Sequence, residues 1–368
     1  MKVHSSINEI PAAQWDALAG THPLLQHAFL STLENSGCVS AKTGWRPEHL
    51  TWWENGTLIA ALPLYRKSHS YGEYVFDWAW ARAFNDAGGA YYPKLTSALP
   101  FTPCPGARLL AQDATTRARC ISEALHYASE ANVSSLHILL SDEAEAKLWN
   151  ASGAMLRSGV QFHWQNPGVK SFYEYLATMN HDKRKRIKQE RRKVGDAGVT
   201  LAVKVGDDIS DADWAHFYRC YENTYLTHRS APYLSLDFFK SFARANPSAQ
   251  VMVIANLGET PLAAALNWRG GDALYGRYWG ALGYIPGLHF EACYYQALAW
   301  CIQNGVQRFE GGAQGEHKLA RGFLPVETYS AHWIAHPDFA TAVARFLQRE
   351  RAGVTHAISE LESSSPFK

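Results

Sequence analysis

The order of predicted elements recurs in the two halves of this 368-residue chain, and the recurrence restricts the fold more than any single motif does. In the first half, two helices end near Gly20 and Gly37, and a hairpin follows. Its strands, 49–54 and 57–65, meet at Asn55-Gly56, a pair that two-residue type I′ turns favour. The remaining predicted elements are a strand (73–80), a helix (115–131), a strand (135–140), a short helix (143–152) and a strand (155–164).

The second half repeats this order. Its predicted elements are helices (172–194 and 211–225), a three-stranded meander (250–256, 262–268 and 273–280), a helix (288–304), a strand (308–310), a short helix (316–321), a strand (328–334) and a terminal helix (339–351). Each half thus reads as helices, meander, helix, strand, short helix and strand. The pattern predicts a duplicated domain, with residues 1–166 in one copy and 167–368 in the other.

A meander followed by a helix and a strand is typical of the acetyltransferase (GNAT) fold. We therefore predict a mixed α/β protein of two tandem GNAT-like domains, each a mostly antiparallel sheet flanked by helices. In this fold an acyl donor's pyrophosphate binds where the helix after the fourth strand begins, because backbone N–H groups there have no helical partner. The polar motifs described below lie in the second domain, which is where we expect the active site.

Composition excludes several classes of protein. The formal net charge is +1, so anion binding must be local. The first 20 residues contain no apolar run of a secretory signal, and no stretch of about 18 apolar residues indicates a membrane span. The six cysteines include no Cys-x-x-Cys pair, which predicts reduced thiols rather than a zinc ribbon or disulfide framework. We expect a soluble, cytoplasmic protein without a tightly bound cofactor.

The first candidate site is Tyr284-Ile-Pro-Gly-Leu-His-Phe-Glu291, which ends the meander and opens a helix. His289 and Glu291 lie in the first turn and are predicted to bind substrate or donor. Alternatively, Glu291 is a first-turn carboxylate that stabilises the helix dipole, and His289 is a surface residue. In this segment a bulky His-Phe-Glu replaces the glycines of a usual acyl-CoA loop, and Glu291 would repel a phosphate.

The second candidate site is the glycine-rich segment 308–323, which follows a short strand. Glycines let a backbone approach a ligand closely, and polar side chains crowd the same loop. Lys318 and Arg321 lie three residues apart and can face one anion. The predicted catalytic residues are Glu310, Glu316, His317 and Lys318, and the predicted binding residues are Gln314 and Arg321. An amide-forming transfer needs a base for the amine and a cation or donor for the oxyanion.

The third candidate is a basic helix, in which eight of the eleven residues from Lys183 to Lys193 are Lys or Arg. We predict that Lys183, Arg184 and Arg186 contact phosphates of an RNA, a nucleotide or a cofactor. The alternative is a solvated helix face that provides charge only.

The fourth candidate is the third strand of the meander. Strand alternation puts Tyr275, Arg277 and Trp279 on one face and Tyr278 on the other. We predict that Arg277 and Trp279 border the cleft, although Trp279 also suits sheet packing. A metal site built from His289, Glu291, Glu310 and His317 has no paired ligand spacing, so no metal is predicted.

These segments resemble the FemAB-like predicted N-acyltransferases, a family often described as peptidoglycan biosynthesis/recognition proteins. The resembling segments are 23–30, 62–67, 179–192, Tyr275-Gly-Arg-Tyr-Trp-Gly280, Leu288-His-Phe-Glu-Ala-Cys-Tyr-Tyr-Gln296 and 309–333. The resemblance implies a tandem GNAT fold related to the Fem ligases, which attach amino acids from aminoacyl-tRNA to peptidoglycan precursors. It also implies that Lys318 and Arg321, before Gly322-Phe323, act near the acyl transfer. The coiled-coil arm of the Fem ligases is not evident.

The predicted function is N-acyl transfer from acyl-CoA or aminoacyl-tRNA to a small-molecule or precursor amine, with tRNA as a partner in the second version. The alternative is a non-catalytic protein that binds RNA or a phosphorylated ligand through the basic helix. The sequence does not specify the oligomeric state.

Overall fold

The computed structural model describes residues 1–313 and 315–368, and every side chain among them except that of Glu316. The chain forms two compact units. Unit 1 contains Met1–Val160 and Glu327–Ile358, and unit 2 contains Gln161–Val326 and Ser359–Lys368. The chain passes from one unit to the other within a long strand at 160/161 and 326/327, and within the C-terminal helix at 358/359. This division differs from the predicted boundary at 166/167, because most of the C-terminal strand and helix belongs to unit 1.

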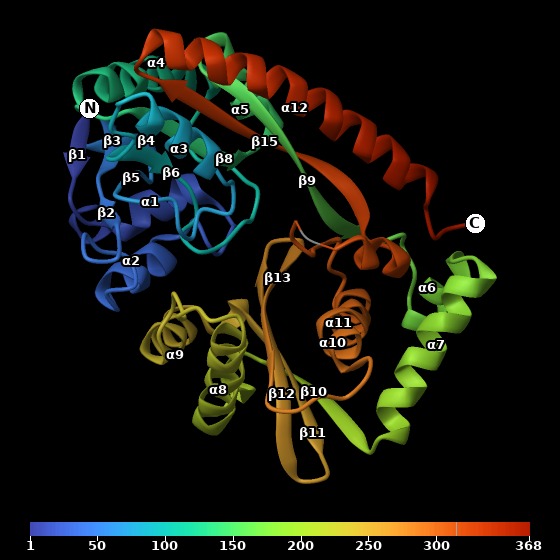
Figure 1. The fold of residues 1–368 in the computed structure, drawn as a ribbon. Coiled ribbons are helices and arrows are strands. Elements are labelled where there is room, and N and C mark those ends of the chain that lie inside the picture. Colours follow the sequence, from blue (N-terminus) through green and yellow to red (C-terminus); the bar gives the residue numbers. More distant parts are fainter. Residues whose placement is uncertain (314) are drawn as a thin grey trace. The chain divides into compact units, whose positions relative to one another are not determined.

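Unit 1 contains two sheets and their covering helices (Figure 1). Its elements are β1 (Lys2–His4), η1 (Ile7–Glu9), α1 (Ala12–Ala19), α2 (His27–Asn35), β2 (Trp45–Pro47), β3 (His49–Glu54), β4 (Thr57–Leu62), β5 (Tyr65–Lys67), α3 (Trp78–Asp86), β6 (Lys94–Ser97), β7 (Leu110–Ala111), α4 (Ala114–Glu130), β8 (Ser135–Ser141), α5 (Glu143–Ala151), most of β9 (Met155–Gln165), most of β15 (Leu324–Ile334) and most of α12 (Pro337–Ser363). One sheet has the order β1-β3-β4-β7, and β2, β5, β6, β8 and β15 are neighbours in the other.

The predicted hairpin is confirmed. Strands β3 and β4 pair antiparallel across Asn55 and Gly56, whose φ angles are 48° and 80°. Two successive positive φ angles are what a type I′ turn requires. The pair Asn-Gly predicts such a turn reliably because both residues adopt positive φ angles at low energetic cost.

The predicted strand at 73–80 is wrong, because this segment leads into helix α3. Its apolar side chains recur at helical rather than strand spacing: Trp80 and Ala81 are buried with the partly buried Phe84 beside them. Before the helix, Glu73 and Asp77 turn inward to the buried ammonium of Lys94, with Glu73 Oε2 at 2.8 Å. The aromatic and β-branched composition favoured a strand. The segment forms a loop instead, because the buried ammonium of Lys94 requires the carboxylates of Glu73 and Asp77 as partners.

Unit 2 contains a sheet of order β10-β11-β12-β13-β14-β9. Its elements are α6 (Phe172–Thr178), α7 (His181–Asp196), β10 (Val199–Val205), η2 (Gly206–Asp208), α8 (Asp211–Thr227), α9 (Leu236–Ala245), η3 (Pro247–Ala249), β11 (Gln250–Leu257), β12 (Thr260–Gly270), β13 (Ala273–Ala281), α10 (Leu288–Phe290), η4 (Glu291–Tyr295), α11 (Gln296–Gln303), β14 (Arg308–Glu310) and η5 (Glu316–Arg321). The predicted meander is confirmed as β11, β12 and β13. Strand β10 and helix α9 were not predicted.

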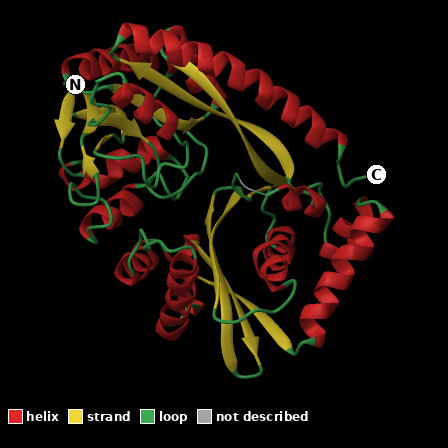
Figure 2. Ribbon diagram, in the orientation of Figure 1, coloured by secondary structure: helices red, strands yellow, loops and turns green. Residues whose placement is uncertain are grey.

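Helices cover both faces of the unit 2 sheet (Figures 1 and 2). Helix α8 packs on β12 and β13, with α9 against α8. On the other face, α11 contacts β10 and η4 contacts β11 and β12, while α7 packs beside β10, η4 and η5. A mostly antiparallel sheet between two helical layers is the arrangement that the element order predicted.

The predicted helix 172–194 is interrupted. Asn180 begins a new helix, α7, because its side chain accepts a hydrogen bond from the backbone N–H of Lys183. Asn at this position satisfies an N–H group that has no partner within the helix. The segment 172–194 therefore forms two helices, and the apolar residues Ile187 and Val194 face the core from α7.

A β-bulge interrupts β13 beside β12. Leu266 pairs with Tyr278 and Asn267 pairs with Gly276, so the register skips Arg277. A bulge inserts one residue into one strand and re-aims the side chains on either side of it.

The bulge overturns the predicted face assignment on β13. Tyr275 pairs with Trp268, and Tyr278 packs on the same Trp268 ring with centroids 5.6 Å apart, on the α8 face. Trp279 instead packs on His289 of α10, on the opposite face. The predicted alternation, which put Tyr275 and Trp279 on one face, is wrong because it assumed an unbroken strand.

No helix in the described part of the chain has the length and apolar character needed to cross a lipid bilayer. All six cysteines are free thiols, as the absence of paired spacings predicted.

Candidate functional site

A cavity of about 100 Å³ opens in unit 2 where β13 and β14 separate. The two strands pair in parallel over only three residues, from Ala273–Tyr275 to Arg308–Glu310, and β13 then continues while β14 ends. The cavity is lined by 265–267 of β12, 276–279 of β13, His289, Cys293 and Tyr294 of the following helix, and Phe309 and Gly311. The β13 bulge lies in its wall.

The helix beside the cavity contains a π-helical turn, η4, between α10 and α11. Such turns insert one extra residue and recur at functional sites. Here Cys293 and Tyr294 line the cavity from the π-helical turn, and His289 lines it from the preceding turn. The helix and the loop that follows β14 therefore face the same space.

Lys318, in η5, is not among the residues that line this cavity, but its side chain interacts electrostatically with Cys293 and Arg277, which are. Its side chain is buried, and a Cβ atom placed on Gly312 would lie 3.9 Å from its Nζ atom. Burial lowers the pKa of Lys318 to about 8; the nearby Arg277 lowers it too, while Cys293 acts in the opposite direction. Its charge therefore interacts with two residues of the cavity wall. At neutral pH the ammonium is mainly protonated, and it makes no hydrogen bond to another group in the described part of the chain.

Two histidines meet beside the cavity. The His289 ring lies 5.4 Å from Trp279 and 6.1 Å from His317, measured between ring centroids. Nε2 of His317 is 3.2 Å from the Tyr294 hydroxyl. Burial, reinforced by the neighbouring cationic side chains, lowers the pKa of His289 to about 4. His289 is therefore neutral at physiological pH and can accept a hydrogen bond.

Arg321 does not face the cavity with Lys318. Its guanidinium is buried, stacks 3.5 Å from the centroid of Phe290, and forms an ion pair of 2.8 Å with Glu190 of α7. It also donates a hydrogen bond of 2.6 Å to the carbonyl of His317. The charge of Arg321 is thus already neutralised by a carboxylate. The ion pair joins η5 to α7, and in this way Arg321 positions Lys318.

Glu310 also lies away from the cavity. Strand alternation puts it on the face opposite Phe309 and Gly311, which line the cavity. Its carboxylate pairs with Arg308 at 3.0 Å. This position does not support the predicted role of Glu310 as a base.

Glu291 points to α7 rather than to the cavity. Its buried carboxylate pairs with Arg191 at 3.1 Å and accepts a hydrogen bond of 2.7 Å from Gln296. Arg191 neutralises the charge that was expected to repel a phosphate. Glu291 and His289 therefore belong to different surroundings, although both lie in the same helix.

The remaining predicted site residues belong to α7 or to the glycine-rich segment 308–323. Lys183, Arg184 and Arg186 lie on α7 and are not among the residues that line the cavity. Arg186 pairs with Glu190 at 3.0 Å. Gln314 lies outside the described residues, and so does the side chain of Glu316, so their predicted roles stay predictions.

The four residues of the imagined metal site do not converge. His289 and His317 are neighbours, but Glu291 pairs with Arg191 and Glu310 pairs with Arg308. Among the residues that the structure describes, no cluster of three or more His, Cys, Asp and Glu side chains could hold a metal ion.

The arrangement suits a reaction that develops negative charge. A buried cation, Lys318, adjoins a small cavity with an interrupted strand in its wall and a neutral histidine at its side. Fixed positive charge in a site of low polarity stabilises an oxyanion more strongly than it would in water. Sequence reasoning missed Cys293, Gly276 and Asn267 as lining residues, because only the bulge and the π-helical turn direct them to the cavity.

Comparison with known proteins identifies a family and a fold. A family model described as FemAB-like, peptidoglycan biosynthesis/recognition, matches residues 6–368. Among curated proteins, none matches the sequence.

Three solved structures share the fold at low sequence identity. The C-terminal domain of a putative lysylphosphatidylglycerol synthetase from Agrobacterium fabrum has a TM-score of 0.57 and 10% identity, with 94% of this chain and 97% of that chain covered. The crystal structure of FemX has a TM-score of 0.57 and 10% identity, with 94% of this chain and 100% of that chain covered. L-PGS from Bacillus licheniformis has a TM-score of 0.53 and 12% identity, with 86% and 95% covered. At these identities the similarity shows the fold alone.

Proposed function

The chain belongs to the FemAB-like family of peptidoglycan biosynthesis/recognition proteins and has its tandem GNAT-like fold, and from this premise we propose that it is an N-acyltransferase. The proposed reaction moves an acyl or aminoacyl group from an activated donor to an amine, in the cavity between β13 and β14 of unit 2. The acceptor we propose is an amine of a cell-envelope precursor.

The observation that carries this proposal is the buried ammonium of Lys318 beside that cavity. Attack of an amine on a thioester or ester carbonyl creates a tetrahedral oxyanion, and Lys318 supplies a cation for it. Arg277, in the bulge, adds a second positive charge near the first. The neutral His289 is a candidate acceptor for the proton of the amine.

Two donors fit this chemistry, acyl-CoA and aminoacyl-tRNA. Both are cytoplasmic molecules, which fits a reaction in the cytoplasm. The name of one structural neighbour, a putative lysylphosphatidylglycerol synthetase, supports the aminoacyl version, since a lysyl product needs an aminoacyl donor. A thiol-release assay with acyl-CoA donors, run beside a transfer assay with labelled aminoacyl-tRNA, shows which of the two donors the protein uses. Transfer from neither donor to a broad panel of amines would refute the proposal.

We predict that Gly276→Ala lowers the transfer rate at least about tenfold, because small displacements of reacting groups are costly. Gly276 lines the cavity, and a Cβ atom there would lie 2.9 Å from Cε2 of Phe309. The methyl group would reduce the cavity and displace the ring. The rate is measured with whichever donor supports transfer.

Gly283→Ala is the matched control. Its Cβ atom would also lie 2.9 Å from an apolar side-chain carbon, Cδ1 of Leu262, but Gly283 does not line the cavity. Equal loss of activity in both variants would indicate a general effect on the sheet and would count against the cavity as the reaction site.

A further inference from the structure

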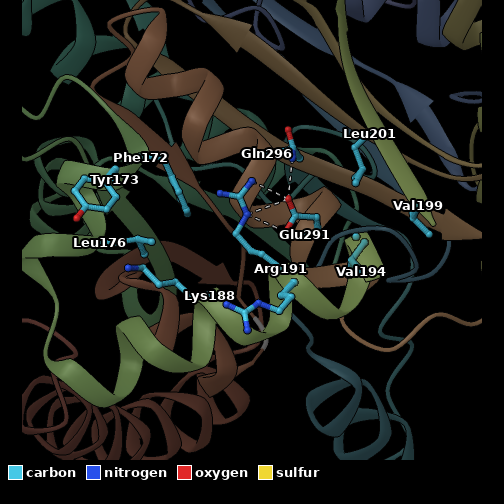
Figure 3. Close-up of a pocket in the computed structure, with 12 residues that line it drawn as sticks. Phe172, Tyr173, Leu176, Lys188, Arg191, Val194, Val199, Leu201, Glu291 and Gln296 are labelled. Atoms are coloured by element: carbon cyan, nitrogen blue, oxygen red, sulfur yellow. Dashed lines mark hydrogen bonds and ion pairs between the residues drawn. The ribbon is translucent and has the colours of Figure 1, made fainter. Parts of the chain in front are cut away.

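A second hollow in unit 2, separate from the cavity at Lys318, lies along α7. This groove of about 700 Å³ is bounded by α6, α7, β10 and the helix that contains Glu291 (Figure 3). The basic residues of α7 have no role in the proposed transfer reaction, and three of them line this groove.

The walls of the groove are apolar on both sides. Val194, Val199 and Leu201 lie on one side, and Phe172 and Leu176 on the other (Figure 3). Apolar walls favour a hydrocarbon chain, since each CH₂ group removed from water contributes to binding.

The floor between these walls carries no net charge. Arg191 crosses it, stacks on Phe172 at 4.8 Å from the ring centroid, and pairs with Glu291 at 3.1 Å (Figure 3). The buried carboxylate compensates the guanidinium, so Arg191 does not attract an anion.

The rim, by contrast, is cationic. Lys188 and Arg192 line the groove, are exposed, and lie four residues apart on one helix, which brings their heads to the same side. Neither has an ion-pair partner among the described residues. Beside them Tyr173 is 73% exposed, with the Lys188 ammonium 5.4 Å from its ring centroid. Tyrosine with lysine is a common pairing at the boundary between lipid and water.

We propose that this groove binds an anionic lipid, with a hydrocarbon chain along the apolar walls and the phosphate between Lys188 and Arg192. An amphiphile matches both the walls and the rim, and clusters of basic residues on a packed helix are known to attract anionic lipids. A single-stranded RNA fits less well, because it requires a succession of aromatic stacking surfaces. The groove offers one exposed ring and an aliphatic wall.

The test uses the full-length protein and vesicles of phosphatidylcholine, with and without phosphatidylglycerol, in a sedimentation assay. We expect binding to the anionic vesicles and little to the neutral ones. Lys188→Glu should weaken binding at least about tenfold. The matched charge reversal Lys193→Glu, on the same helix but outside the groove, should weaken it less than about threefold. Equal effects of the two substitutions would overturn the assignment to the groove.

A second variant tests the hydrocarbon part without changing the charge. Gly195 lines the groove within α7, and a Cβ atom there has no neighbour within 4 Å, so Gly195→Leu adds apolar volume to the groove at a position that has room for a side chain. Titration with a soluble short-chain phosphatidylglycerol should show at least about tenfold weaker binding to this variant. Inorganic phosphate and a short single-stranded RNA are titrated in parallel.

Two further results would overturn the proposal. One is unchanged binding of the short-chain lipid by Gly195→Leu, which would leave only a charged surface. The other is tight RNA binding, lost in Lys188→Glu, without any binding to anionic vesicles, which would assign α7 to a nucleic acid. The groove residues take no part in the transfer chemistry proposed above, so either result leaves that proposal intact.

Discussion

Replacing Lys318 by alanine is expected to slow the proposed transfer by about 10²–10³-fold, the loss typical when one group that stabilises an oxyanion is removed. The Lys318 ammonium is buried beside the cavity, and its charge interacts with Cys293 and Arg277 in the cavity wall. Its removal leaves no other lysine in η5 to replace it. The measurement is the transfer rate at saturating donor.

The fold should survive this substitution, so loss of rate can be separated from loss of structure. Lys318→Met keeps the aliphatic stem and removes the buried charge, and we expect it to be inactive but no less stable than the wild type. Lys193→Ala, an exposed lysine on α7, is the control and should leave the rate unchanged. Wild-type turnover by Lys318→Met would exclude Lys318 from the site.

The pH dependence should identify the role of Lys318. Burial lowers its pKa to about 8 from the usual 10.5, so the folded state binds this proton less tightly than the unfolded state does. Its charge therefore costs stability below pH 8, and stability increases as the pH rises from about 8 to 10.5. Activity should do the opposite, because the oxyanion needs the charged form: the rate should fall above pH 8.

Lys318→Arg separates this effect from titration of the acceptor amine, which is the same for both proteins. A guanidinium stays protonated up to about pH 12, so the fall in rate above pH 8 should disappear in this variant. A wild-type rate that instead rises through pH 8, and no longer does so in Lys318→Arg, would make Lys318 a base and contradict the oxyanion assignment.

The sequence predicted those elements whose signals are local. Asn55-Gly56 specified its turn directly, and the meander at 250–281 is bounded by glycine turns, so both predictions are confirmed. The pairing of the helix at Leu288 with the loop before Lys318 followed from the fold, since both come after neighbouring strands.

The sequence could not predict features that depend on tertiary partners. Nothing in the local pattern of β13 marks Arg277 as a bulge, and this bulge reverses the face of Trp279. Glu291 is typical of a first-turn carboxylate, but its partner, Arg191, is 100 residues away. Arg321 was predicted to bind a substrate or donor anion together with Lys318, because the two residues lie three apart. Its charge is instead neutralised by Glu190.

Arg321→Ala is expected to lower the free energy of unfolding of unit 2 by about 3–5 kcal/mol, the usual cost of removing one partner of a buried ion pair. Three contacts disappear together: the pair with Glu190 at 2.8 Å, the stack on Phe290 and the hydrogen bond to the His317 carbonyl. Burial alone would raise the pKa of Glu190, but the Tyr295 hydroxyl and the charge of Arg321 outweigh it, and this pKa is lowered. Urea denaturation at neutral pH measures the loss.

Arg186→Ala is the matched control, because Arg186 pairs with the same carboxylate at 3.0 Å but from an exposed position. Exposed pairs contribute less than about 1 kcal/mol, so this variant should unfold almost like the wild type. The pKa of Glu190 is lowered, so its carboxylate becomes protonated only when the pH falls below the ordinary range of a glutamate. The contribution of its charge is then lost, and the difference in stability between the two variants should narrow. Equal stability of both variants at neutral pH would mean that the Glu190 pair does not hold η5 in place, and Lys318 would then need another support.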